Sequence, residues 1–366
     1  MPPSPALKET AEVTILRTSM VSTARSEHAA KVGVLMVSAR WTSALGLGSM
    51  IALASLLVPG CAKPRPPEVF SVQQEEWKSG SITGRRMLTD HFEIYTTVRD
   101  EAFVELLPRF MESAHAQYRT LVPPGLENPA RLVIYLFAGR RDWERFTASH
   151  WPHRAGIYRR IQSGAFTEGT TSVAYYLDRP RTLSVLAHEG LHQYVAQQIP
   201  AELPAWLNEG LACYCESFEL HRGQLSFTPR DNPNRLRSLC EGINAKTLLP
   251  LREILRTHAG EVIAATDRRV YNYYAQAWAL IVYLNEPPDG PHAAGLRRLL
   301  QELGTEQYRF GIGAYVAATE PPEGIPINAG EAAFHKYITA DLDEFERSFR
   351  TYLLRLASLA GGDVGG

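Results

Sequence analysis

Two stretches decide how this sequence is interpreted: His188-Glu189-Gly190-Leu191-His192 and, after it, Trp206-Leu207-Asn208-Glu209-Gly210-Leu211-Ala212. Residues four apart lie about one turn apart on the same face of a helix, so the imidazoles of His188 and His192 can converge on one metal ion. Glu189 is offset by about 100° on the helical wheel. It can therefore reach a water molecule on that ion without being a ligand itself.

The flanking residues predict two helices that bring a third ligand to the histidines. Asp178 and Pro180 are typical of a helix start, and Pro200 ends that pattern. Pro204 opens a second helix, and two short helices joined by a turn can pack antiparallel, which would return Glu209 to the motif. A catalytic zinc takes three protein ligands and a water.

The predicted metal ligands are therefore His188, His192 and Glu209 of one Zn²⁺ ion, with Glu189 as the catalytic general base. A zinc ion that only braces the fold would have four protein ligands, and here three can be named. The pattern predicts a zinc hydrolase, most readily a peptidase.

These residues resemble the gluzincin metallopeptidases, in which the motif helix gives two histidines and a second helix gives the glutamate. The segment 206–212, with Glu216 beyond it, is similar to the zinc-ligand segment of the M1-type aminopeptidases. Residues 90–356 look most like the peptidase-MA-like domains of bacterial envelope proteins. The resemblance implies a zincin-like fold and a peptide or protein substrate.

The sequence also departs from those families. The gap from His192 to Glu209 is shorter than in the aminopeptidases, and no Gly-x-Met-x-Asn segment lies upstream, so aminopeptidase specificity is not implied. Thermolysin-like enzymes carry an aspartate one turn after the ligand glutamate, whereas this sequence has Cys213. The group that orients the histidines is therefore unassigned, with Glu216 the nearest candidate on that face.

The rest of the chain predicts an α+β fold. Apolar alternation, continuous apolar runs and helical spacing predict strands and helices before the motif, over 91–97, 101–118, 131–137, 141–148, 164–166 and 171–177. After Glu216 the pattern is helical, over 248–255, 271–284, 294–303 and 341–359. We expect a small mixed sheet with the motif helix in an upper lobe (82–200) and a mostly helical lower lobe (201–366).

Two further site predictions rest on the resemblance. In those families the strand before the motif helix lies at the cleft edge and pairs with extended substrate, so residues 171–177 are either that strand or an ordinary strand of the sheet. Tyr274 leads a Tyr-Ala-Gln segment like one in related envelope domains, and is the catalytic candidate for donating to the oxyanion. Tyr271 and Tyr273 are weaker candidates, because an aromatic stripe at helical spacing is more often core.

The N-terminal segment predicts export. Residues 44–58 are nearly all apolar or small, too short a run for a membrane span but typical of a signal-peptide core. The run leads to Leu57-Val58-Pro59-Gly60-Cys61, which resembles a bacterial lipobox. We predict a lipoprotein signal peptide over 36–60, lipidation of Cys61 and a Pro-rich tether over 61–81, with an uncleaved membrane anchor as the alternative.

The same segment bears on the start of the chain. Met36 would begin a signal peptide of ordinary length, so we hypothesise that residues 1–35 are a mis-assigned N-terminal extension. The intact mass of the native precursor tests this. The predicted location is extracytoplasmic, with the chain lipid-anchored to a bacterial membrane.

The charge composition argues against one class of partner. With 38 basic and 39 acidic residues the chain has no basic footprint, so nucleic acid is not an expected partner.

The cysteines and the remaining histidines are not assigned to the site. Apart from Cys61, either Cys213 or Cys215 pairs with Cys240, or all three are free thiols. The remaining histidines look isolated and are interpreted as structural or surface residues: His91, His115, His150, His153, His221, His258, His292 and His335.

Two other function classes remain open. The first is a catalytically degenerate peptidase-like domain that acts as an envelope binding module, which would bind zinc without hydrolysing peptides. The second is a serine hydrolase, but no Gly-x-Ser-x-Gly elbow occurs in the sequence.

Overall fold

The chain is described here by a computed structural model, which covers residues 72–159, 161, 164–221, 224–258, 268–287, 290–319 and 327–359. All of these lie in one compact unit, Pro66–Gly366. The predicted extension, the signal peptide and Cys61 lie outside the described residues. None of the helices in the described part is long and apolar enough to cross a membrane.

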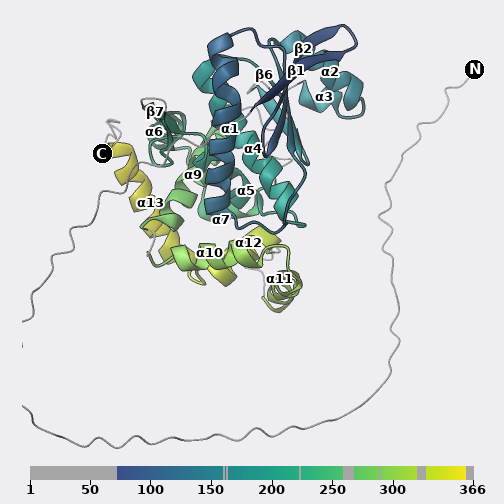
Figure 1. The fold of residues 1–366 in the computed structure, drawn as a ribbon. Helices are drawn as coiled ribbons and strands as arrows, with labels where there is room; N and C mark the ends of the chain where they lie inside the picture. The colour runs from purple at the N-terminus through teal and green to yellow at the C-terminus, as the bar shows by residue number, and fades with distance from the viewer. Residues whose placement is uncertain are drawn as a thin grey trace, which may run out of the picture. The chain divides into compact units, whose positions relative to one another are not determined.

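The first half of this unit contains a six-stranded mixed sheet (Figure 1). Its strands run in the order β1-β2-β3-β4-β6-β5. The neighbours β3, β4 and β6 are parallel, and the other pairs are antiparallel. The bounds are β1 Gln73–Ser79, β2 Ile82–Leu88, β3 Phe92–Thr96, β4 Leu132–Phe137, β5 Ala165–Glu168 and β6 Thr171–Tyr175.

The tether predicted over 61–81 extends too far, because Gln73–Ser79 form β1 and pair along their whole length with β2. Most side chains of β1 are exposed. An edge strand held by backbone hydrogen bonds needs no apolar alternation, so its sequence carries no strand signal. Gly80, at φ 59°, provides the tight turn between the two strands.

Of the two interpretations of residues 171–177, the structure supports an ordinary strand of the sheet. Residues Thr171–Tyr175 form β6, which pairs with β4 on one side and with β5 on the other, so it is an interior strand with no free edge. A tight turn through Gly169, at φ 56°, folds β5 back onto the outside of β6. The strand at this end of the sheet is therefore β5.

Helices cover both faces of the sheet. On one face lie α1 (Glu101–Leu121) and α4 (Arg179–Gln198), packed against Leu132, Ile134 and Leu136 of β4. On the other lie α2 (Arg140–His150) and α3 (Ala155–Tyr158), in a smaller aromatic core that includes Phe137. The alternation of β4 side chains between two cores explains its continuous apolar sequence.

Three contacts fix the motif helix α4. Asp178 caps its N-terminus by accepting from the backbone N–H of Arg181. The Tyr118 hydroxyl of α1 donates to the carbonyl of Ala187 over 2.7 Å. From the opposite side, the Gln193 amide donates to two backbone carbonyls of the sheet region, at 2.6 and 2.7 Å. The motif is thus held between α1 and the sheet.

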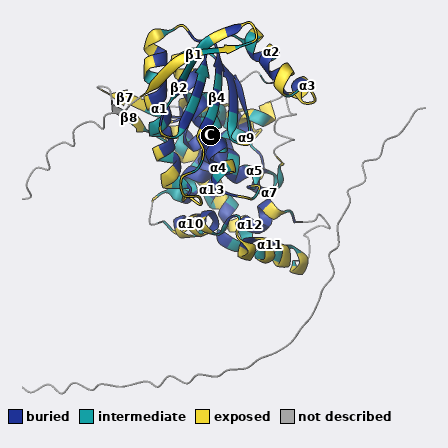
Figure 2. Cartoon of the chain, turned by 45° about the vertical axis from the view of Figure 1, so that its right-hand side comes forward, coloured by how far each residue is buried: buried dark blue, intermediate teal, exposed yellow. Residues whose placement is uncertain are grey.

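The chain after α4 is mainly helical. The strands β7 (Phe218–His221) and β8 (Gln224–Phe227) form a hairpin that the sequence analysis did not expect. The helices among the described residues of this part are α5 (Ala205–Tyr214), α6 (Pro233–Asn244), α7 (Leu251–Arg256), α9 (Arg268–Asn285), α10 (Ala293–Glu302), α11 (Glu306–Ala318), α12 (Ala329–Tyr337) and α13 (Leu342–Leu359). Helix α9 is buried along most of its length, whereas α11 presents many exposed residues (Figure 2).

The fold is α+β, as predicted. Helix α5 lies so close to α9 that a Cβ at Gly210 would come within 2.6 Å of the carbonyl oxygen of Ala277. This close approach places α5 between α4 and α9, and so places Glu209 beside the motif. The division into an upper and a lower lobe stays a prediction.

Candidate metal centre

Three donor atoms converge where α4 meets α5. The Nε2 atoms of His188 and His192 are 3.1 Å apart. Oε2 of Glu209 lies 3.4 Å from the first and 3.5 Å from the second. The three side chains, here called the motif site, are 12%, 15% and 12% exposed, so they are largely sheltered but reachable from solvent.

This triangle could hold one metal ion, and its dimensions compare with those of a zinc site. Zinc–nitrogen and zinc–oxygen bonds of about 2.0–2.2 Å in a tetrahedron imply donor–donor distances of about 3.3–3.6 Å. Oε2 of Glu209 is buried and has no hydrogen-bond partner in the described part of the chain. Because a buried carboxylate oxygen is costly without a partner, a cation at this point would satisfy it.

The electrostatics of the motif site favour a positive charge. Burial alone would lower the pKa of His188, but contacts with Cys213, Glu209 and Glu216 raise it well above its ordinary value. Burial acts on His192 in the same way, and the charge of Glu209 raises its pKa. The field that favours a proton on these imidazoles also favours a cation between them.

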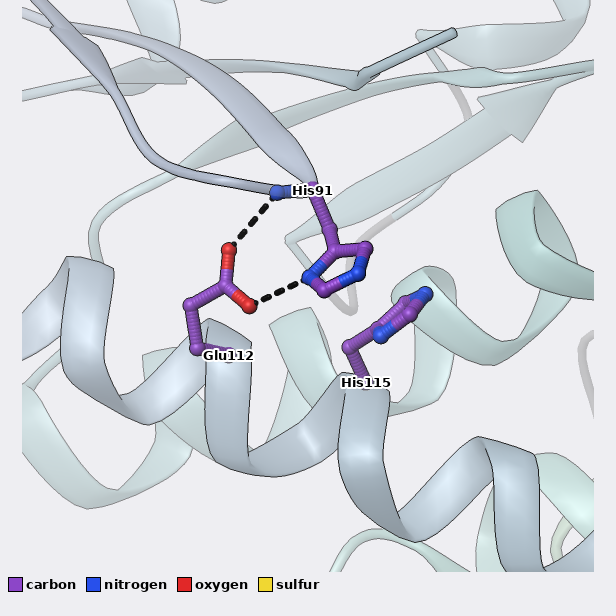
Figure 3. A group of neighbouring side chains, drawn as sticks. All are labelled: His91, Glu112 and His115. Atoms are coloured by element: carbon purple, nitrogen blue, oxygen red, sulfur yellow. Dashed lines mark hydrogen bonds and ion pairs between the residues drawn. The ribbon is translucent and has the colours of Figure 1, made fainter. Parts of the chain in front are cut away.

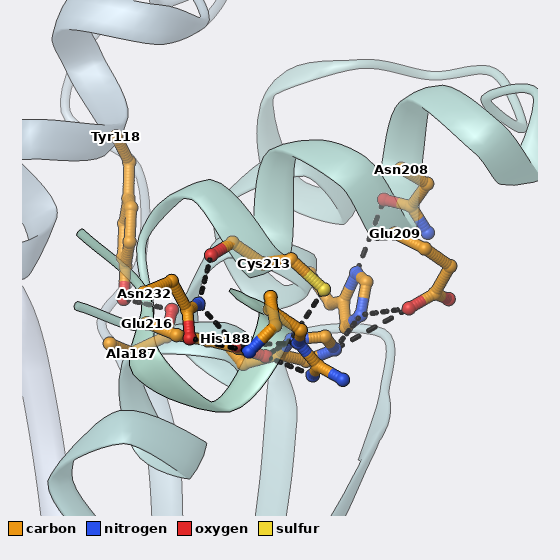
Figure 4. Close-up of polar contacts among 10 residues, drawn as sticks. Tyr118, Ala187, His188, Asn208, Glu209, Cys213, Glu216 and Asn232 are labelled. Carbon is orange, nitrogen blue, oxygen red and sulfur yellow. Dashed lines mark hydrogen bonds and ion pairs between the residues drawn. The ribbon is translucent and has the colours of Figure 1, made fainter. Parts of the chain in front are cut away.

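Each histidine is oriented through its other ring nitrogen (Figure 4). Nδ1 of His188 donates to Oε1 of Glu216 over 2.9 Å. Nδ1 of His192 donates to Oδ1 of Asn208 over 3.2 Å. Both Nε2 atoms therefore lie toward Glu209, on the side of each ring that makes no orienting bond, as in metal-binding histidines. Glu216 takes the orienting place considered for it, while Asn208 was missed by the sequence analysis.

Glu216 is itself held from α6. Nε and a terminal nitrogen of Arg235 donate to its two oxygens at 2.8 and 2.5 Å, and Asn232, the N-cap of α6, donates to it over 2.8 Å. Burial alone would raise the pKa of Glu216, but the charge of Arg235 and the hydrogen bond from His188 lower it to about 2. The carboxylate stays ionised and fixes the imidazole of His188.

A second donor group overlaps this site, made of His188, Cys213 and Glu216. The guanidinium of Arg235 occupies both oxygens of Glu216, and burial raises the pKa of the Cys213 thiol. A fixed positive charge and a protonated thiol disfavour a metal ion here, so this group is an orienting network. Cys213, Cys215 and Cys240 are all free thiols.

Glu189 lies beside the motif site without being one of its three donors. Its Oε2 accepts a hydrogen bond of 2.6 Å from Thr167 Oγ1 on β5. Thr167 also contacts Ser172 Oγ of β6, at 2.8 Å. Two strands of the sheet thus fix the carboxylate that the sequence analysis assigned as general base.

The structure brings Tyr274 to the motif site and leaves Tyr271 outside it. The ring of Tyr274 lies 6.1 Å from that of His188, and Arg235 stacks over it at 5.0 Å. Burial and the nearby Glu209 raise the pKa of Tyr274 well above its ordinary value, so the phenol keeps its proton. Tyr271 is 61% exposed, and Tyr273 is buried in the core.

His91 and His115 are not isolated, contrary to the sequence interpretation. Together with Glu112 they form another group of donor atoms, all within 4.8 Å of one another. The pair Glu112 and His115, three residues apart on an amphipathic helix, is the signal that could have drawn attention to it.

Comparison with known proteins adds one match. Residues 182–299 match a family described as "Protein of unknown function (DUF1570)". This segment contains the motif site, Glu189, Glu216, Arg235 and Tyr274. No curated protein matches the chain.

Proposed function

We propose that this chain is a zinc-dependent peptidase of the gluzincin type, with His188, His192 and Glu209 as zinc ligands. The observation that carries the proposal is the triangle of their donor atoms, 3.1–3.5 Å on a side, in which a buried oxygen of Glu209 lacks a hydrogen-bond partner among the described residues. A chance histidine pair on a helix does not require a buried carboxylate to face it.

A zinc ion held there would lower the pKa of a bound water from 15.7 to about 7 and polarise the scissile carbonyl. Glu189, held by Thr167, takes the proton of the attacking water and passes it to the leaving amine. Tyr274 has a protonated hydroxyl near the site and is proposed to donate to the oxyanion.

The proposed substrate is an extended peptide or protein segment. Within the described residues β5 pairs only with β6, so its outer edge has backbone groups available to a further strand. Thr167 of β5 also binds Glu189, so a peptide added to this edge runs past the base. We therefore propose a peptidase outside the cytoplasm of a bacterium, tethered to the membrane by the predicted lipid anchor at Cys61.

The test combines metal removal with one pair of variants. We expect the purified full-length chain to cleave a quenched peptide library, to lose cleavage after chelation and to regain it with zinc. Glu209→Gln is expected to lose both zinc and cleavage, whereas Glu219→Gln, at an exposed position on β7, is expected to keep both.

Two results would contradict the proposal. Cleavage that survives chelation would point to a hydrolase without zinc, such as a serine enzyme. Zinc bound at the motif site with no cleavage of any peptide would favour the alternative, a degenerate domain that binds envelope partners.

A further inference from the structure

A further group of side chains that could hold a metal ion shares no residue with the motif site (Figure 3). His91 immediately precedes β3, while Glu112 and His115 lie on one face of α1. None of the three contributes to the motif site. We call this group, His91, Glu112 and His115, the strand–helix cluster.

The cluster is built into the fold. Glu112 and His115 are three residues apart, so both side chains face the start of β3. Oε1 of Glu112 accepts from the backbone N–H of His91 over 2.8 Å, and Oε2 lies 2.6 Å from Nδ1 of its ring. The rings of His91 and His115 stack with centroids 3.8 Å apart. His115 also packs edge-on against Phe92 and Tyr194.

The cluster is both sheltered and reachable. His115 is 5% exposed and the Glu112 side chain 16%, whereas the His91 side chain is 37% exposed. His91 and His115 line an open cavity of about 780 Å³, together with Asp90, Glu127 and Asn128. A ligand could therefore enter from the cavity and meet donors held by α1.

We propose that the strand–helix cluster binds a second divalent transition-metal ion, such as zinc, through His91, Glu112 and His115. Two imidazoles and one carboxylate suit zinc and its neighbours better than calcium or magnesium, which prefer oxygen donors. The cavity that His91 and His115 line would give a water molecule access to complete the coordination of the ion.

Binding requires a small local rearrangement. Two donors of one tetrahedral zinc ion lie about 3.3–3.6 Å apart, so the 2.6 Å pair of His91 and Glu112 must separate. If Nδ1 of His91 is the ligand atom, the neutral ring carries its one proton on Nε2 instead. His91 is the most exposed of the three and precedes the strand, so its ring can turn most easily.

The ion would stabilise the platform of the motif helix. It would link β3 to α1, and α1 supports α4 through Tyr118 and through the contact of His115 with Tyr194. Because the ion binds only the folded arrangement, it would raise the unfolding temperature. It would take no part in the proposed hydrolysis.

The test is zinc stoichiometry of the full-length chain after dialysis against metal-free buffer and titration with zinc. We expect two zinc ions per chain in the wild type and one in His91→Asn, Glu112→Gln or His115→Asn. The exposed His153→Asn is the matched control and is expected to keep two. The second zinc equivalent should raise the unfolding temperature of the wild type but not of His91→Asn.

His188→Asn separates this proposal from the proposed function. An ion kept in His188→Asn and lost in His91→Asn supports the strand–helix cluster even if the motif site binds nothing. The second site would be overturned if the wild type and His91→Asn had the same zinc content and zinc changed their unfolding temperatures equally.

Discussion

Replacing Glu216 by glutamine tests how the motif site is oriented. The wild-type carboxylate accepts from His188 Nδ1 over 2.9 Å and is held by Arg235 and Asn232. The amide of Glu216→Gln keeps the shape of the side chain but loses its charge. Arg235 donates to both oxygens of Glu216, so the NH₂ group that replaces one of them leaves at least one of these hydrogen bonds without an acceptor.

Glu216→Gln is expected to lower two quantities, the zinc affinity and the free energy of unfolding. Removing a partner that orients a metal-bound histidine costs about 10–100-fold in metal affinity, which corresponds to about 1.4–2.8 kcal/mol. Leaving Arg235 buried without its carboxylate also destabilises the fold, by about 3–5 kcal/mol. Both Arg235 and Glu216 are largely buried, with side chains 18% and 7% exposed, so solvent screens the pair little.

The loss of stability should depend on pH. The pKa of Glu216 is lowered to about 2 in the folded chain from an ordinary value of 4.5. Its contribution is therefore fully present above about pH 4.5 and is lost as the pH falls toward 2. Thermal unfolding of Glu216→Gln and wild type should differ most near neutral pH and converge in acid.

Glu331→Gln is the matched control. Glu331 is a fully buried carboxylate held by Arg252 and Arg256 on α7, away from the motif site. Its replacement should also lower the unfolding temperature, but should leave zinc affinity unchanged. Zinc affinity is measured on the folded proteins by competition with a chromophoric chelator. An unchanged affinity in Glu216→Gln, or an equal loss in Glu331→Gln, would refute the assigned role of Glu216.

Three further substitutions test neighbouring parts of the account. Thr167→Val should lower kcat in peptide hydrolysis while zinc content stays the same, because Glu189 loses its hydrogen-bond donor; unchanged kcat would argue against this role. Tyr274→Phe should lower kcat about 10²–10³-fold, whereas the exposed Tyr271→Phe should not; equal kinetics in both would remove Tyr274 from the mechanism. Gly210→Ala should destabilise the fold by about 1–3 kcal/mol, because its Cβ would meet the Ala277 carbonyl at 2.6 Å; Gly313→Ala, with open space around it, is the control in thermal unfolding.

The local part of the site was predictable from sequence. Helical spacing places His188 and His192 on one face, and the two prolines that bound the turn after the motif predict that Glu209 returns to them. These inferences need only short-range geometry. The structure brings the three residues together, and the fold class is the one expected.

The non-local part was not predictable. Arg235 reaches Glu216 only after the β7–β8 hairpin, and no local pattern joins them. The strand order that puts β5 outside β6 depends on pairing between segments, which the alternation of either strand does not encode. The strand–helix cluster likewise depends on where the start of β3 meets α1.

The most direct measurement compares the wild type with Glu189→Gln for zinc content at the motif site and for cleavage of a peptide library. Because Glu189 is the proposed base and not a ligand, both proteins should bind zinc there, and only the wild type should cleave. Undiminished cleavage by Glu189→Gln would contradict the assigned base. No zinc bound through His188, His192 and Glu209 in either protein would contradict the account at its centre.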